Sequence, residues 1–133
     1  MAYNRGYTPE KITRLQDNEI FVFGSNLAGR HAGGAARTAH NCFGAIWGLG
    51  VGPQGQCYAI PTMHGGPQAI KPYIDQFINY ALEHSQQLFL VTRIGCGIAG
   101  YTPQQIAPLF TDALHINNVI LPKDFVEIIL DIR

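Results

Sequence analysis

Short apolar runs occur four times along the chain, and each of them predicts a buried strand. They are rich in β-branched and aromatic residues, and glycine, proline or polar residues bound them. The four runs cover Glu19–Phe23, Gln56–Ile60, Leu88–Thr92 and Asn118–Leu121. Because polar residues do not alternate with apolar ones inside these runs, they indicate a mainly parallel sheet that is covered on both faces.

Segments with helical periodicity separate the apolar runs. In residues 70–84 the apolar side chains recur on one helical face. Pro72 predicts that the regular part of this helix begins beside that residue, because proline removes a backbone donor. We expect further helices at 34–43, from Thr102 onwards, and at 125–129.

Capping and turn signals define the ends of some of these elements. Thr102 and Gln105 have the spacing of a capping box, with Pro103 at the first helical position. Pro108 predicts a kink further along the same helix. The glycine-rich residues 48–55 predict a loop or turn.

Strands and helices alternate along 133 residues, which is close to the commonest size of a domain. We therefore expect one α/β domain over residues 1–133, with a mostly parallel sheet and helices on both faces. Ligands of such sheets bind beyond the carboxyl ends of the strands. Two glycine-rich loops leave strands at that end and should meet around one pocket.

The composition narrows the class of ligand. Nine basic residues balance nine acidic ones, and only 14% of the residues are charged. Nucleic-acid-binding domains usually carry a basic stripe, so a general nucleic-acid partner is not expected. A single phosphorylated small molecule fits a neutral chain better. The low charge also leaves room for an oligomer surface.

Cysteine usage and hydropathy indicate the compartment. The three cysteines lack C-x-x-C spacing, so neither a disulfide framework nor a structural zinc site is expected. The N-terminal residues contain no apolar leader, and no stretch approaches the roughly 18 apolar residues that span a bilayer. These features predict a cytoplasmic protein without a membrane partner.

The first glycine-rich loop joins a strand to an alanine-rich helix. Glycine allows a positive φ and a close approach to a ligand, and the helix start presents free N–H groups. Such an element is suited to hold phosphate, although it matches neither the Walker loop nor G-x-G-x-x-G. The predicted ligand-binding residues of this loop are Gly24, Ser25, Asn26, Leu27, Ala28, Gly29, Gly33, Gly34 and Ala35.

Three polar side chains of this loop have both a functional and a structural interpretation. Asn26 could bind a ribose hydroxyl through its amide, or it could form a local backbone bond that shapes the loop. Arg30 and His31 could contact a bound anion, or they could be ordinary loop residues. Asn26 and His31 are the candidates for a catalytic role.

The second glycine-rich loop follows the third predicted strand. Its backbone N–H groups could wrap a diphosphate from the opposite side, as a nest does. Tyr101 could pack on a sugar or close the end of the sheet as a core aromatic. The predicted ligand-binding residues here are Arg93, Gly95, Cys96, Gly97, Ile98, Ala99, Gly100 and Tyr101, together with Thr62 after the second strand.

Covalent and metal chemistry have little support in these loops. Cys96 could be a nucleophile near a helix start, but no histidine neighbours it in sequence and a small buried residue explains it as well. Neither loop contains a carboxylate, and no histidine pair has i, i+4 spacing. We therefore expect no metal and no cofactor.

The two loops together resemble those of the macro domain family of ADP-ribose-binding modules. The likeness covers residues 18–122 and rests on Gly24-Ser25-Asn26, Gly33-Gly34-Ala35-Ala36, Gln56–Pro61 and Thr92–Tyr101. The opening of the first loop is similar to a small macro-like group of bacteria and their phages. The resemblance implies a three-layer α/β/α domain, an asparagine at the distal ribose and both loops along the diphosphate.

The second loop is similar to macro domains that remove ADP-ribose from glutamate, with two departures. Ala99 stands where those enzymes have an aspartate, and Lys71 and Lys123 do not match their nucleophilic lysine. Another hydrolytic branch of the family uses a water positioned by the substrate and needs neither residue. The resemblance names no base-recognition residue; Asp17, before the first strand, is a candidate by its place alone.

Three functional hypotheses follow. The first is binding of ADP-ribose, or of an ADP-ribosyl nucleotide derived from NAD, by a reader, sensor or sequestering protein. The second is a hydrolase that removes ADP-ribose from a protein or a small conjugate, with Asn26 and His31 near the scissile bond. The third is a non-catalytic protein that associates with itself through its apolar surface and has no nucleotide affinity.

Overall fold

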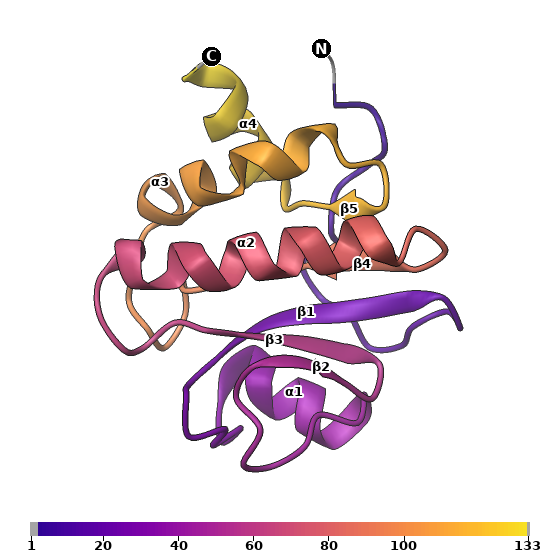
Figure 1. Ribbon diagram of the computed structural model, residues 1–133, viewed down its shortest axis with the longest axis vertical. Coiled ribbons are helices and arrows are strands. Elements are labelled where there is room, and N and C mark those ends of the chain that lie inside the picture. The colour runs from indigo at the N-terminus through magenta and orange to yellow at the C-terminus, as the bar shows by residue number, and fades with distance from the viewer. Residues whose placement is uncertain (1–2, 133) are drawn as a thin grey trace.

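The computed structural model describes residues 3–132 and contains a five-stranded sheet (Figure 1). The strand order is β2-β3-β1-β4-β5, and only β2 runs antiparallel to its neighbour. The strands are β1 (Glu19–Ser25), β2 (Gly52–Gln54), β3 (Cys57–Pro61), β4 (Leu88–Val91) and β5 (Val119–Ile120). The helices are α1 (Gly34–Cys42), α2 (Pro67–Glu83), α3 (Pro103–Ile106), the 3₁₀ helix η1 (Ala107–His115) and α4 (Lys123–Asp131).

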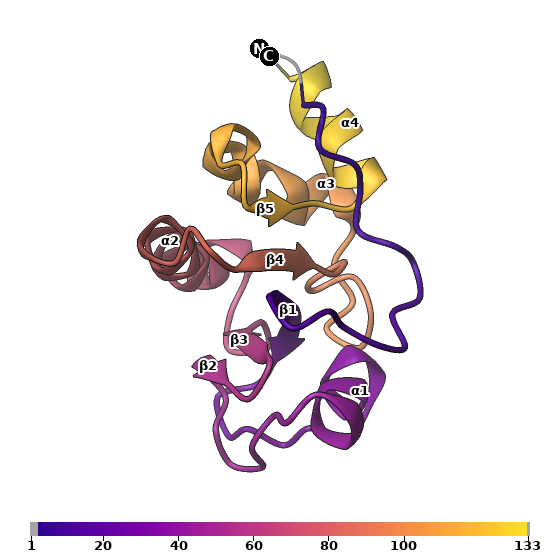
Figure 2. The same ribbon diagram turned by 90° about the vertical axis from the view of Figure 1, so that its right-hand side faces the viewer.

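The predicted α/β class and mostly parallel sheet are confirmed. Side chains of β1 alternate between two cores: Phe21 and Phe23 pack on the side of α1, and Ile20 and Val22 pack on the side of α2. Figure 2 shows α1 and α2 on opposite sides of the sheet. Alternation of this kind follows from the two-residue period of a strand, and here both faces are apolar because both are covered.

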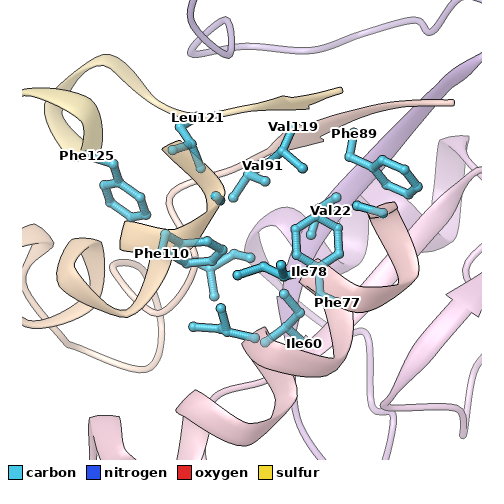
Figure 3. Packing of buried hydrophobic residues seen from close by; sticks show 14 of the residues in the cluster. Val22, Ile60, Phe77, Ile78, Phe89, Val91, Phe110, Val119, Leu121 and Phe125 are labelled. Atoms are coloured by element: carbon cyan, nitrogen blue, oxygen red, sulfur yellow. The ribbon is translucent and has the colours of Figure 1, made fainter. Parts of the chain in front are cut away.

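The larger core lies between the sheet and the helices α2, η1 and α4. Figure 3 shows Phe77 of α2, Phe110 of η1 and Phe125 of α4 among side chains from the strands. All three rings are fully buried. The smaller core on the other face contains α1 and is completed by Ile12 and Leu15 from the N-terminal segment.

The prediction of a loop over residues 48–55 is wrong in part, because the segment contains β2. This three-residue strand forms a hairpin with β3, in which Pro53 pairs with Tyr58. Gly55, with φ +56°, lies in the turn of the hairpin. Proline lacks a backbone donor, so Pro53 made the sequence resemble a loop. An edge strand tolerates proline, and β2 therefore still forms.

The predicted start of α2 beside Pro72 is also wrong, because the helix begins five residues earlier at Pro67. Proline at this first position is favourable, since its missing N–H would have no helical partner there. Pro72 lies inside the helix, where it removes one backbone hydrogen bond. Burial of five apolar side chains along α2 offsets that loss; they are Ile70, Ile74, Phe77, Ile78 and Ala81.

The predicted capping box is confirmed, whereas a 3₁₀ helix replaces the predicted kinked helix at Pro108. The Gln105 backbone N–H donates to the Thr102 hydroxyl, and the Thr102 N–H donates to the Gln105 side chain at 2.9 Å. The α-helix then ends at Ile106, and the chain continues as a 3₁₀ helix that contains Pro108.

The predicted helix at 125–129 is present as part of α4. Within residues 3–132, no helix is long and apolar enough to cross a membrane.

The N-terminal segment is fastened to the far edge of the sheet by side chains. The Arg5 guanidinium donates three hydrogen bonds, to the carbonyls of Val119, Leu114 and Ala113, at 2.7, 3.0 and 2.8 Å. Its Cζ also lies 4.1 Å from the centre of the Tyr3 ring. Arg5 therefore ties together the end of η1, β5 and the N-terminal segment.

We expect Arg5→Ala to lower the free energy of unfolding by about 2 kcal/mol, because three carbonyls lose a charged donor. Urea unfolding followed by circular dichroism measures this change. Arg14→Ala is the control, since Arg14 is exposed. Equal stability of the two variants would contradict the structural role of Arg5.

Candidate functional site

A cavity of about 310 Å³ lies at the carboxyl ends of β1, β3 and β4. Both glycine-rich loops line it, so the prediction that they meet around one pocket is confirmed. The lining residues are Gly24, Ser25, Asn26, Arg30, Ala32, Gly33, Gly34, Ala35, Ala36, Thr62, Met63, Thr92, Arg93, Ile94, Gly95, Gly97, Ile98 and Ala99. The three strands converge here because they are parallel and adjacent in the sheet.

The cavity includes most, but not all, of the predicted ligand-binding residues. The predicted residues outside the lining are Leu27, Ala28, Gly29, Cys96, Gly100 and Tyr101. The lining residues that were not among the predicted ligand contacts are Ala32, Ala36, Met63, Thr92 and Ile94. Arg30, for which an anion contact was one of two alternatives, is also in the lining. Met63 lies two residues after β3 and Thr92 directly after β4, so the rule that ligands bind beyond the strand ends could have found them once the sheet order was known.

In the structure the Asn26 side chain forms local backbone hydrogen bonds that shape the loop, which was the structural alternative for this residue. Its Oδ1 accepts a bond from the Arg30 N–H at 2.9 Å, and its Nδ2 donates to the Arg30 carbonyl at 3.0 Å. The oxygen and the nitrogen of the Asn26 side-chain amide therefore both hold the loop from residue 26 to residue 30 closed. Asn26 still borders the cavity, and its amide keeps one N–H donor and one acceptor lone pair beyond these two bonds.

Gly29 has a structural role rather than a place in the lining. Its φ is +69°, and a Cβ at this position would lie 2.3 Å from the backbone of Gly48. The Ser25 hydroxyl donates to the carbonyl of Gly50 in the same neighbouring loop. The loop 46–50 thus supports the outer side of the cavity wall formed by the first glycine-rich loop.

The start of α1 faces the cavity without a side-chain cap. Gly33 occupies the N-cap position, and the first turn contains no acidic residue. The first N–H groups of a helix have no partner within the helix, which gives this end a partial positive charge. A Cβ at Gly33 would lie 2.8 Å from the Ile98 Cδ1, so the two loops touch across the cavity.

His31 lies outside the lining, which is a correction to its proposed place near a scissile bond. The side chain is buried, and its ring packs 5.4 Å from the ring of Phe23 and 6.3 Å from that of Trp47. Its Nε2 donates to the carbonyls of Ile46 and Leu49 at 2.8 and 3.1 Å. His31 therefore holds the supporting loop 46–50 in place.

Tyr101 and Cys96 also have structural roles. The Tyr101 hydroxyl donates to the carbonyl of Gly65, and its ring packs against the larger core, so it closes the end of the sheet. Burial raises the pKa of the Cys96 thiol, with a smaller lowering from Arg93. A raised pKa reduces the thiolate fraction at neutral pH, which disfavours a nucleophilic role.

Two arginines provide the charge of the cavity. Arg30 and Arg93 are both in the lining, and no aspartate, glutamate or histidine of the described residues is. The Arg93 Nη2 lies 2.8 Å from the Asp124 Oδ2, which comes from the first turn of α4. The cavity is therefore suited to an anion.

Asp17 does not meet the other predicted site residues. It precedes the amino end of β1, whereas the cavity lies at the carboxyl end of this seven-residue strand, roughly 20 Å away along the strand.

Among residues 3–132, no group of three or more histidine, cysteine or acidic side chains could hold a metal ion.

No family model, no curated protein and no solved structure matches the chain.

We expect His31→Phe to lower the free energy of unfolding by about 1–3 kcal/mol, because the ring packing is kept while two carbonyls lose their donor. Urea unfolding followed by the fluorescence of Trp47, the chain's single tryptophan, measures it. His40→Phe is the matched control: its ring also contacts Trp47 and its Nδ1 bonds one carbonyl, but it is exposed to water. A larger loss in the control than in His31→Phe would contradict this role.

Proposed function

We propose that the chain binds ADP-ribose, or an ADP-ribosyl nucleotide derived from NAD, without turning it over. The observation that carries the proposal is the single cavity between two glycine-rich loops, lined by two arginines and by no carboxylate among the described residues. Its volume lies at the lower end of the range of small-molecule sites, about 300–1,000 Å³.

The chemistry of the lining favours a diphosphate. Backbone N–H groups at the start of α1 attract an anion, and the absence of a side-chain cap leaves them open to a ligand. Glycines at 33, 34, 95 and 97 remove side-chain bulk on both sides of the cavity. Arg30 and Arg93 add charge-assisted donors, which suit phosphate oxygens. The resemblance of these loops to macro domains then favours ADP-ribose among the possible diphosphates.

The same lining favours binding over hydrolysis. General acid–base catalysis needs a titratable side chain within hydrogen-bond reach of the reacting atoms. The described lining contains no carboxylate or imidazole, Ala99 replaces the aspartate of the glutamate-directed enzymes, and His31 is engaged elsewhere. A reader, sensor or sequestering protein needs none of these groups.

We expect Gly97→Asp to weaken ADP-ribose binding at least about tenfold, because a carboxylate in the cavity repels the diphosphate and occupies its space. Gly97 has an ordinary φ, and a Cβ there would meet nothing within 4 Å, so the variant should fold. Calorimetric titration with ADP-ribose measures the change.

Gly66→Asp is the matched control for Gly97→Asp. This position is equally open but lies outside the lining, at the N-cap of α2, where aspartate is favourable. The control should bind like the wild type. Absence of heat with the wild-type protein would refute ADP-ribose binding, and equal binding by both variants would place the ligand elsewhere.

We expect no release of ADP-ribose from a protein that carries a radiolabelled ADP-ribosyl group. The label should stay on the carrier during hours of incubation, because the cavity lining contains no carboxylate or imidazole among residues 3–132. Gly97→Asp is incubated in parallel. Release that scales with the wild-type concentration and disappears in this variant would instead support the hydrolase hypothesis.

A further inference from the structure

Arg93 has two neighbours of opposite kinds. One is the cavity, whose lining it joins at the end of β4. The other is Asp124, whose Oδ2 lies 2.8 Å from the Arg93 Nη2. Asp124 is not in the lining, so a carboxylate outside the cavity partly neutralises the charge of a residue that lines it.

This ion pair differs from the other ion pair within residues 3–132. Lys71 and Asp75 are four residues apart on the surface of α2, whereas Arg93 and Asp124 join the second glycine-rich loop to α4. Arg30, the other cation of the lining, belongs to the first loop. The Arg93 side chain remains 53% exposed, so it can be reached by a solute while it is paired.

The geometry of the pair leaves Arg93 available to a second anion. The contact to Asp124 uses the terminal nitrogen Nη2, and a guanidinium has five N–H donors in a planar fork. A diphosphate in the cavity would therefore share this guanidinium with Asp124 and would compete with it for the positive charge. Two anions on one guanidinium also repel each other, so the carboxylate reduces the affinity for the ligand.

We propose that Asp124 is an internal competitor that lowers the affinity of the cavity for diphosphate by holding Arg93 in an ion pair. This inference rests on the proposed function for the identity of the ligand. The competition between Asp124 and the ligand for Arg93 would apply to any diphosphate. Asp124 is a positioning residue, because it is not in the lining and acts through Arg93.

A second role of Asp124 must be separated from this one. The carboxylate lies in the first turn of α4, where a negative charge stabilises a helix. Loss of this role would lower thermal stability and would not strengthen ligand binding. Affinity and stability are therefore measured on the same variants.

The test is a double-mutant cycle with Asp124→Asn, Arg93→Gln and the double variant. Calorimetry gives the dissociation constants of ADP-ribose and, separately, of inorganic pyrophosphate. We expect Asp124→Asn to bind both ligands about two- to fivefold more tightly at low salt, the range measured for exposed ion pairs. The gain should shrink as ionic strength rises and should vanish in the Arg93→Gln background.

Asp131→Asn is the matched control, because it removes the same charge from the other end of α4. It should leave both dissociation constants unchanged. Unchanged or weaker pyrophosphate binding by Asp124→Asn, or a gain that persists without Arg93, would overturn the inference. If the wild type binds pyrophosphate but not ADP-ribose, the proposed function fails while the cycle with pyrophosphate still decides the role of Asp124. If neither ligand binds the wild type or Asp124→Asn, both proposals fail.

Discussion

Parallel pairing of β1 with both β3 and β4 is the constraint on which the rest of the structure depends. The strand is buried on both faces, and its neighbours run in the same direction with their carboxyl ends at one edge. Every chain segment that leaves this edge is therefore brought to the same place. The cavity, the start of α1 and both arginines owe their proximity to this pairing rather than to contacts among themselves.

Most of this arrangement could be predicted from the order of apolar runs and glycine-rich loops. The four parallel strands were visible because buried strands of a parallel sheet are short and uninterrupted. β2 was hidden because Pro53 and the glycines around it have the composition of a loop. The helix start at Pro67 does not follow from the local sequence, because the cost of Pro72 is offset by burial of the whole apolar face of α2.

Side-chain roles in the site were harder to predict than its position. The interpretation of Asn26 depends on whether its amide meets a ligand or the backbone of Arg30, and both fit the same residue type at the same place. His31 is held by carbonyls 15 and 18 residues away, and no local pattern reveals such partners. The glycines of the two loops also have different roles that the sequence does not distinguish. A side chain at Gly29 would collide with the backbone of Gly48, whereas Gly97 adjoins open space.

The contact between Ile98 and Gly33 has a consequence for the kinetics of the site. Ile98 is 69% exposed, yet the end of its side chain lies against the first glycine-rich loop and joins two walls that approach from different strands. Rotation about side-chain bonds takes only picoseconds to nanoseconds at exposed positions, so the gap between Gly33 and the end of Ile98 can change without a change in the backbone. The residence time of a bound molecule can be altered at position 98 while the polar groups around the ligand stay the same.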